Sequence, residues 1–553
     1  MSVQHDESLP VEQPPARRLP ARLVLLLLVA AIGLVSCPAE QYGGDPWAWI
    51  MEASNLVNRA TLTIDDRIAR DFGDPGLWLF YNEKDDRRVS KYGFGSTLLL
   101  YVPYQIQNWL AGRPVSHFGR LPATNAAHWL LGLVLAWVLF ETARLFTRAP
   151  GAALAWVLIV IYSSFVWNYM RAHSSELYQL LFFSATLYCL LRAARARWCA
   201  GWLCGASALL GFLCLVKLVY LPLVAVNALV VFALTAWDRR EAGAATRRML
   251  LAAARAVVWT LLPALFAGGA LMAINAHKFG HPLETGYSQW ASEQQAFSGN
   301  PLEALYGFLV NPRHSVWFHF WPLVPALFYF RRFARKYARE AILILANFAV
   351  MLAILCSYKL WHGECCYGPR YLLFGLPSLA LPLLLLLEAF RRGSPRLVRW
   401  AFGSITALAV ACQIVVAYFP FFYYYRIRDN VLGYLGETSQ QPYLDAAPFP
   451  LIYAEFLGWR VTGRLPTVLE SAERNIGQSA RYARARGVLW NTLRANIWWL
   501  RSGRGSRRAA LIEQYMDRAQ LIDRSSADAD PPARHAILPR RTFPPEDGED
   551  GPV

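Results

Sequence analysis

Apolar runs close to twenty residues long recur from residue 23 to residue 422, and they constrain the fold more than any other feature of the sequence. A helix needs about twenty predominantly apolar residues to cross the hydrocarbon core of a bilayer, and a soluble core has no place for so many runs of this kind. The mean hydropathy of +0.25 agrees with this interpretation. The sequence therefore predicts an all-α integral membrane protein, a polytopic bundle of about eleven transmembrane helices.

The predicted spans are 23–35, 122–145, 152–169, 174–192, 200–217, 219–237, 253–275, 316–330, 340–357, 371–390 and 399–422. Residues 91–111 decide the topology, because every later loop changes side if they cross the membrane. This segment is apolar but is interrupted by Gly93, Gly95, Pro103 and side-chain amides. Such a segment is a poor span and a good surface segment, so we expect it to lie in the membrane interface.

The basic residues support this choice. With 91–111 in the interface, the loops that collect dense arginine clusters all fall on one side, as the positive-inside rule requires of cytoplasmic loops. These clusters lie at 144–148, 192–197, 239–248, 331–339 and 391–399. The net charge of +17 is therefore explained by loop placement, and no nucleic-acid partner is predicted.

Four regions are expected along the chain. Residues 1–22 are predicted to be a disordered cytoplasmic N-terminus, and 23–422 the membrane domain, with a large first outer loop at 38–121. Residues 423–523 are predicted to be a small, partly helical extramembrane region, followed by a disordered tail at 524–553. The topology places this C-terminal part outside the cytoplasm despite its arginines, which long tails tolerate. An alternative is that residues 34–37 form a lipoprotein cleavage box, which would remove the first helix at Cys37.

Asp45 lies in the segment YGGDPW, just beyond the first predicted span. An acidic side chain at this position, on the outer membrane surface, suits an enzyme that acts on a lipid-borne substrate. The plainer interpretation is a helix N-cap, because aspartate followed by Pro46 at the first helical position is a good helix start. Asp45 is therefore predicted either as a cap or as a functional acid.

Other polar residues gather in the outer segments. Glu176 lies at the outer end of a span, where a carboxylate is costly unless it is paired or functional, although stabilising the helix dipole is an alternative. Lys217 lies between two spans and either extends toward the interface or contacts a ligand. The loop 276–315 adds Glu284, Tyr287 and His314.

The last outer loop, residues 358–371, combines Lys359 and Arg370 with aromatic residues that include Tyr367. Two cations among aromatic rings at an outer membrane surface suit a lipid phosphate, and arginine offers a bidentate fork. The alternative is ordinary interfacial anchoring.

No metal site is predicted. Cys365 and Cys366 follow His362, but adjacent cysteines cannot easily share one tetrahedral zinc site. Six of the other cysteines lie in or beside apolar segments and are expected to be small core residues. These six are Cys189, Cys199, Cys204, Cys214, Cys356 and Cys412.

The outer-loop acid after the first span, together with four strings, resembles bacterial membrane glycosyltransferases of the GT-C superfamily, of the protein O-mannosyltransferase and aminoarabinose-transferase type. The strings are KYGFGSTLLLYVPY (91–104), FGHPLETGY (279–287), PLEALYGFLVNPRHSVWF (301–318) and YGPRYLLFGLP (367–377). The resemblance covers about residues 40–390. Related sequences usually read SPGRG where this chain has NPRHS (311–315), and they have glycine and tryptophan where this chain has residues 362–366. These two differences bear on the identity of the donor sugar and the acceptor more than on the reaction class.

The resemblance implies a polyprenyl-phosphate sugar donor, an extracytoplasmic active site in the bacterial inner membrane, and an acceptor-activating aspartate. Asp45 occupies that aspartate position, and Glu176 matches the second acidic position. Lys359, Arg370, Tyr367, Lys91, Tyr92 and Lys217 are the expected phosphate-binding residues, and Glu284, Tyr287 and His314 are expected on the acceptor side. The acceptor is a lipid, a glycan or a protein. No cofactor is required; a divalent metal between carboxylates is an alternative that no ligand spacing supports.

Two other functions compete with glycosyl transfer. A non-enzymatic transporter or flippase of lipid-linked sugars would line its path with charged residues inside the spans. The predicted spans are nearly free of charge, and the polar residues gather in the outer loops, which favours the enzyme. A structural membrane partner that interacts through its C-terminal tail would leave the outer clusters unexplained.

Overall fold

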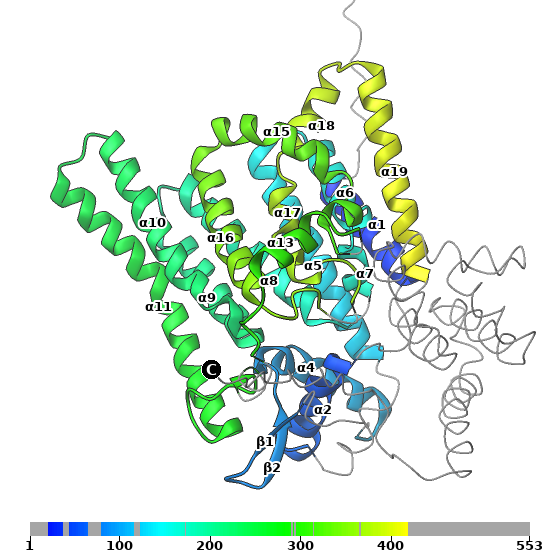
Figure 1. Cartoon of the computed structure of the whole chain (residues 1–553), viewed down its shortest axis with the longest axis vertical. Coiled ribbons are helices and arrows are strands. Elements are labelled where there is room, and N and C mark those ends of the chain that lie inside the picture. The colour runs from blue at the N-terminus through cyan, green and yellow to red at the C-terminus, as the bar shows by residue number, and fades with distance from the viewer. Residues whose placement is uncertain are drawn as a thin grey trace, which may run out of the picture.

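The computed structural model describes residues 20–36, 44–64, 79–114, 122–171, 173–288, 291, 295–312, 314–363 and 366–418. The predicted regions 423–523 and 524–553, most of the segment 1–22, and Cys37 lie outside these ranges. The described part is a bundle of long helices with a smaller unit of helices and a hairpin at one end (Figure 1).

The first half of the chain runs through α1 (Ala21–Ser36), α2 (Gly44–Arg59), β1 (Leu79–Asn82), β2 (Arg87–Ser90), α4 (Phe94–Ala111), α5 (Pro122–Phe146), α6 (Pro150–Tyr162), α7 (Val166–Arg171), α8 (Ser175–Arg195), α9 (Ala200–Val216), η2 (Leu218–Tyr220), α10 (Pro222–Glu241) and α11 (Thr246–Phe279). The second half runs through α13 (Pro301–Leu309), α14 (Val316–His319), α15 (Leu323–Lys336), α16 (Ala338–Ser357), η3 (Arg370–Gly375), α17 (Leu376–Leu379), α18 (Leu383–Arg391) and α19 (Arg396–Tyr418).

Six helices of the described residues are long and apolar enough to cross a membrane, and a seventh results if η3–α17 and α18, which are bent by 41°, form one span. The six are Ala123–Phe146, Ser175–Arg195, Leu218–Glu241, Thr246–Phe279, Ala338–Ser357 and Arg396–Ala417. Three shorter apolar helices lie within α1, α6 and α9, at other predicted spans, whereas α4 is not among the six. The chain is thus a helical protein with several candidate spans, and the number eleven stays a prediction.

Two of the predicted spans are broken. In the run 152–169, α6 ends before Ser163 and Ser164, whose hydroxyls donate to the carbonyl oxygens of Ile159 and Val160. Hydroxyl groups that bond to carbonyls four residues earlier disturb and bend helices. In the run 316–330, α15 begins directly after Pro322, which has no N–H to continue a helix from α14.

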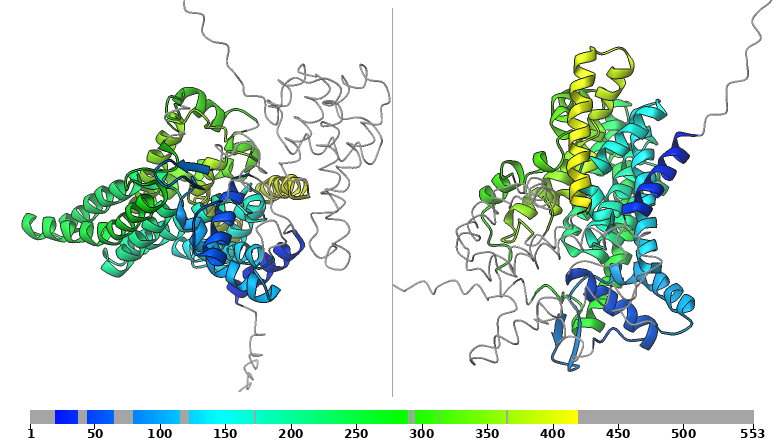
Figure 2. Two further views of the ribbon diagram at one scale, coloured as in Figure 1. Left: turned by 90° about the horizontal axis from the view of Figure 1, so that it is seen from below. Right: turned by 90° about the vertical axis from the view of Figure 1, so that its right-hand side faces the viewer.

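The two ends of the bundle differ in chemistry. At the end here called the arginine end, ion pairs join the start of α1 to the end of α5, and the start of α16 to the ends of α8 and α10. These pairs are Arg22–Glu141 (2.5 Å), Arg195–Glu340 (3.0 Å) and Arg339–Asp238 (2.6 Å). Figure 1 shows α2, the hairpin and α4 at the opposite end, here called the loop end. The right-hand view of Figure 2 shows the same separation from the side.

The unit at the loop end contains a β-hairpin, which corrects the all-α prediction. β1 and β2 pair antiparallel with Leu79 opposite Ser90, and the Tyr81 hydroxyl donates to the Asp86 carboxylate at 2.5 Å across the turn. Asp86 has a φ of 47°, a conformation that aspartate tolerates better than most residues. Residues 83–86 are polar turn formers flanked by aromatic and β-branched residues, so cross-strand pairing is favoured here over a helix.

Glycines allow the loop-end unit to lie directly on the bundle. A Cβ atom on Gly93 would lie 2.3 Å from the carbonyl oxygen of Leu215 and 2.4 Å from that of Val216. A Cβ on Gly95 would lie 2.7 Å from the Val216 nitrogen. The glycines of the KYGFG string are therefore contact points between the start of α4 and the last turn of α9.

The first helix is an integral part of the bundle. Leu25 and Val29 of α1 are buried in the main hydrophobic core. At the end of α1, the Arg171 Nε donates to the Ser36 carbonyl oxygen at 2.7 Å, and the Trp167 indole N–H donates to the Ser36 hydroxyl at 3.2 Å. Both ends of α1 are therefore fixed to neighbouring helices.

Candidate functional site at the loop end

The centre of the candidate site is a cluster of Glu176, Arg370, Tyr371 and Lys217, here called the Glu176 cluster. Glu176 lies in the first turn of α8, where the positive end of the helix dipole stabilises its negative carboxylate. Arg370 opens η3 and places Nη1 at 3.9 Å from Glu176 Oε1. The Glu176 side chain is 9% exposed and the Arg370 side chain 20%, so this pair is partly shielded from water but accessible.

Tyr371 joins the two cations of the cluster. The Arg370 guanidinium lies 4.9 Å from the centroid of the Tyr371 ring and donates to its hydroxyl at 3.1 Å. Lys217 Nζ, from the junction of α9 and η2, lies 5.0 Å from the same centroid. Tyr371 thus brings the ammonium and the guanidinium together, with the Glu176 carboxylate beside the guanidinium.

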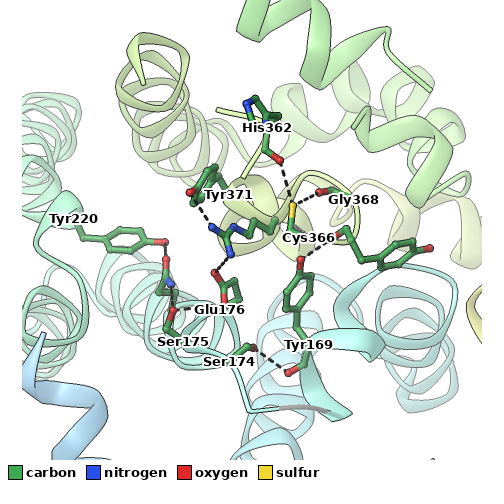
Figure 3. A network of polar contacts seen from close by, with 12 residues as sticks. Tyr169, Ser174, Ser175, Glu176, Tyr220, His362, Cys366, Gly368 and Tyr371 are labelled. Atoms are coloured by element: carbon green, nitrogen blue, oxygen red, sulfur yellow. Dashed lines mark hydrogen bonds and ion pairs between the residues drawn. The ribbon is translucent and has the colours of Figure 1, made fainter. Parts of the chain in front are cut away.

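Polar side chains on α8 and η2 support the carboxylate. The Tyr220 hydroxyl donates to Gln179 Oε1 at 3.0 Å, and Gln179 Nε2 donates to the Ser175 hydroxyl at 3.1 Å. The Ser175 hydroxyl in turn lies 3.5 Å from Glu176 Oε2. Figure 3 shows this chain of contacts running from Tyr220 to Glu176. It fixes the first turn of α8 and therefore the direction in which the carboxylate approaches Arg370.

The loop before η3 is closed by buried hydrogen bonds. The Tyr169 hydroxyl donates to the Tyr367 carbonyl oxygen at 2.9 Å, and the Cys366 thiol contacts the carbonyl oxygens of His362 (3.2 Å) and Gly368 (3.5 Å), as Figure 3 shows. Tyr367 is fully buried, and its hydroxyl donates to Gln413 of α19 at 3.2 Å. Tyr367 therefore lies in the packed core, away from the surface on which phosphate binding was predicted for it.

Three other predicted residues, Lys91, Tyr92 and Tyr287, meet beside the start of α4, and together with Trp49 they are called here the Lys91 cluster. Lys91 Nζ lies 5.6 Å from the Tyr92 ring and 5.7 Å from the Tyr287 ring. Tyr92 contacts Tyr287 at 5.8 Å and Trp49 at 5.4 Å between centroids.

Two glycine contacts place this cluster in the fold. A Cβ on Gly286 would lie 2.4 Å from Lys91 Cα, which explains the glycine of the ETGY string. Gly93 and Gly95 bring the same segment against Val216, the residue before Lys217. The Lys91 cluster therefore adjoins the Glu176 cluster through the end of α9.

The remaining predicted residues lie apart from these clusters or at their edge. Lys359 is exposed and follows Tyr358, whose ring contacts Tyr371 at 5.8 Å. Glu284 accepts a hydrogen bond from Ser288 within its own turn. His314 is buried and packs against Trp361 at 5.6 Å.

Asp45, the predicted base, lies in the first turn of α2, because the helix begins at Gly44. The helix thus starts two residues earlier than the N-cap alternative for Asp45 requires. Pro46 is compatible with the longer helix, since the N–H it lacks has no intrahelical partner in the first turn. The side chain of Asp45 lies outside the described residues, so its catalytic role stays a prediction.

A buried ion pair at the loop end was not predicted from the sequence. Glu52 Oε1 of α2 lies 2.6 Å from Lys278 Nζ of α11, with the two side chains 0% and 1% exposed. The Thr97 hydroxyl of α4 donates to Glu52 Oε2 at 2.5 Å, and Lys278 Nζ donates to the Tyr92 carbonyl oxygen at 3.1 Å. Burial raises the pKa of the Glu52 carboxyl, and the Lys278 ammonium opposes that rise. Lys278 falls within the predicted outer loop 276–315, but nothing in the sequence names its partner.

Two histidines also meet near the start of α8. The rings of His128 and His173 lie 4.6 Å apart, and His128 Nε2 contacts the Tyr169 carbonyl oxygen at 3.2 Å. Burial, and secondly the neighbouring His128, lower the pKa of His173, so His173 is neutral at pH 7. Among the described residues no group of three or more His, Cys, Asp or Glu side chains is placed to hold a metal ion.

No family model matches the chain, and no curated protein matches it in sequence. Among solved structures, the chain is similar to ArnT from Cupriavidus metallidurans bound to undecaprenyl phosphate, with 16% identity, coverage of 86% of this chain and 76% of ArnT, and a TM-score of 0.48. It is also similar to the oligosaccharyltransferase AglB from Archaeoglobus fulgidus in complex with an inhibitory peptide and a dolichol phosphate, with 12% identity, coverage of 83% and 60%, and a TM-score of 0.42. Both neighbours are glycosyltransferases of the GT-C type, the superfamily that the sequence resembles. Identities and TM-scores this low do not assign a function to the chain.

Proposed function

We propose that the protein is a membrane glycosyltransferase that moves a sugar from a polyprenyl-phosphate donor to an acceptor hydroxyl at the loop end of the bundle. The observation that carries this proposal is the Glu176 cluster. Two cations share one aromatic ring there, and the Glu176 carboxylate lies beside one of them.

The donor phosphate would lie between Arg370 and Lys217. Arginine offers two parallel N–H groups to a phosphate, and lysine adds a compact charge. In the structure, Arg370 meets Glu176 only at 3.9 Å, which is longer than a charge-assisted hydrogen bond. Glu176 would therefore keep the guanidinium oriented without holding it in a tight ion pair that a phosphate must first break.

The transfer step needs one base and a stabilised leaving group. The acceptor oxygen forms a bond to the anomeric carbon, and the bond between that carbon and the donor phosphate oxygen breaks. The acceptor proton passes to the Asp45 carboxylate, and the electron pair of the broken bond leaves with polyprenyl phosphate. Arg370 and Lys217 stabilise the charge on that phosphate, so no general acid is required.

We further propose that the loop end faces the extracytoplasmic side. In this topology the arginine end carries the basic loops and lies in the cytoplasm, as the positive-inside rule requires, and α4 lies in the interface without crossing. The eleven predicted spans then alternate in direction. A lipid-linked donor would reach the Glu176 cluster from the outer leaflet of the bacterial inner membrane.

The test is the binding of a long-chain polyprenyl phosphate by the purified protein in lipid nanodiscs, measured by native mass spectrometry against the matching polyprenol without phosphate. Arg370→Gln and Lys217→Gln each remove one charge-assisted contact, worth about 1.5–3 kcal/mol, so each should weaken phosphate-lipid binding about ten- to a hundredfold. Arg339→Gln is the matched control, because it breaks a charge contact at the opposite end of the bundle.

Equal affinity of both variants and the unmodified chain for polyprenyl phosphate would place the phosphate elsewhere and refute this site. Equal affinity of the unmodified chain for the phosphate and the polyprenol would count against a phosphate-dependent donor altogether. Loss of affinity in Arg339→Gln as well would mean that the effect is one of folding.

A further inference from the structure

The buried pair of Glu52 and Lys278 joins three elements at the loop end. Glu52 belongs to α2, Lys278 to the last turn of α11, and Thr97, which donates to Glu52, to α4. Lys278 also donates to the backbone of Tyr92, in the segment that leads into α4. Apolar residues of α2 and α4, such as Trp49 and Leu100, pack in a cluster separate from the main core of the bundle, and the ion pair connects this outer unit to the membrane helix α11.

A buried ion pair is an unusual way to obtain stability alone. Removing two charges from water is costly, and apolar side chains of the same volume often serve stability equally well. What the pair adds is a defined geometry, because its charges and hydrogen bonds are satisfied in one arrangement of α2, α4 and α11. The apolar contacts around it, such as Phe80 against Phe279 at 4.9 Å, have no comparable directional requirement.

Asp45 belongs to the same helix as Glu52, so the ion pair also affects where Asp45 lies. Asp45 precedes Glu52 by seven residues in α2, about two helical turns, so both belong to the same side of the helix. The same pair fixes the backbone of Tyr92, next to Lys91. A rotation or shift of α2 that separated Glu52 from Lys278 would therefore move Asp45 and the Lys91 cluster relative to α11.

We infer that Glu52 and Lys278 are positioning residues, which hold α2 and the segment 91–97 in the arrangement needed for transfer while leaving the donor phosphate site unaffected. This inference rests on the proposed function. Catalytic geometry is sensitive to small displacements, and a shift of about 1 Å can reduce the rate about a hundredfold. The Glu176 cluster is built from α8, η3 and the junction of α9 and η2, none of which contributes a side chain to the pair.

The experiment uses the full chain in nanodiscs with Glu52→Gln, Lys278→Met and the double variant, which leaves no buried charge unpaired. Three quantities are measured: polyprenyl-phosphate affinity, the kcat of sugar transfer, and deuterium uptake of residues 44–64 and 91–97 relative to 122–171. We expect kcat to fall about ten- to a hundredfold in all three variants, faster uptake in the two outer segments, and polyprenyl-phosphate affinity within about twofold of the unmodified chain. Glu52→Asp, which keeps the charge, should recover part of the kcat.

Glu340→Gln is the matched control, since it removes the carboxylate of the Arg195 pair at the arginine end and should leave uptake at the loop end unchanged. Unchanged uptake of 44–64, or a double variant with the kcat of the unmodified chain, would overturn the inference. A proportional loss of kcat and donor affinity would also overturn it, because that is the result of general unfolding. If the unmodified chain bound polyprenyl phosphate but transferred no sugar, the proposed function would fail, whereas the uptake data would still test the positioning role.

Discussion

Replacing Gly93 by alanine tests the contact between α4 and α9. Gly93 has φ −61° and ψ 138°, an extended conformation that alanine adopts without strain. The backbone therefore does not oppose the change. The added methyl group would lie 2.3 and 2.4 Å from two carbonyl oxygens, and real Cβ contacts with such atoms are about 1 Å longer.

The magnitude follows from these distances. The two carbonyls belong to the backbone at the end of α9, which cannot shift as easily as the far end of a side chain, so the start of α4 must move by about 1 Å. Overpacking of this kind costs about 1–3 kcal/mol, against about 0.4–1 kcal/mol gained from a less flexible unfolded chain. We expect net destabilisation, together with a transfer rate reduced about a hundredfold because Lys91 and α2 move with α4.

The assay compares thermal unfolding in detergent and sugar transfer in nanodiscs for Gly93→Ala and Gly403→Ala. A Cβ on Gly403, within α19, would meet nothing within 4 Å, so that control should be neutral or slightly stabilising. A Gly93→Ala variant as stable and as active as Gly403→Ala would show that the close contact between α4 and α9 is not real.

Three further predictions concern single positions. Asp45→Asn should keep expression, fold and donor binding while transfer falls about 10²- to 10⁴-fold, the usual contribution of a positioned base; transfer at the normal rate would leave Asp45 no catalytic role. Tyr367→Phe should lower the unfolding temperature, because Gln413 loses its buried partner, yet leave polyprenyl-phosphate affinity unchanged; weaker binding would restore the donor role predicted from the sequence. A reporter cysteine at Trp109 should react with an impermeant thiol reagent in intact cells and one at Arg335 only after permeabilisation, with the unmodified chain as background; reaction of both in intact cells would mean that α4 crosses the membrane.

Long apolar runs and loop arginines predicted the helical membrane architecture because both act locally. A run such as the predicted span 340–357 needs no knowledge of its neighbours to become a helix, and α16 covers all of it. The breaks inside the predicted spans were harder to foresee. Ser163 and Ser164 resemble ordinary small residues of a membrane helix until their hydroxyls are seen to bond backward along it.

The candidate site was predicted in part. Arg370, Lys217 and Glu176 were each chosen for their charge at an outer helix end, and the structure brings them together around Tyr371. Tyr367 was chosen for its motif, but burial and not motif decides where a tyrosine hydroxyl points. Glu52 was missed because its partner is supplied by another helix far along the chain, and a single sequence carries no signal of such a pairing.

The attachment of Ser36 to Trp167 and Arg171 has a consequence for biogenesis. These hydrogen bonds span 131 and 135 residues of sequence. At the usual synthesis rate of about 5–20 residues per second, the partners of Ser36 emerge from the ribosome roughly 7–26 s after it. During that interval the last residue of α1 lacks these two hydrogen-bond partners, so the segment that leads to Asp45 has no fixed starting point. Under the proposed function, assembly of the transfer site is therefore delayed until α7 has been synthesised, and a chain truncated before residue 167 would contain the proposed base without the contacts that fix the start of its segment.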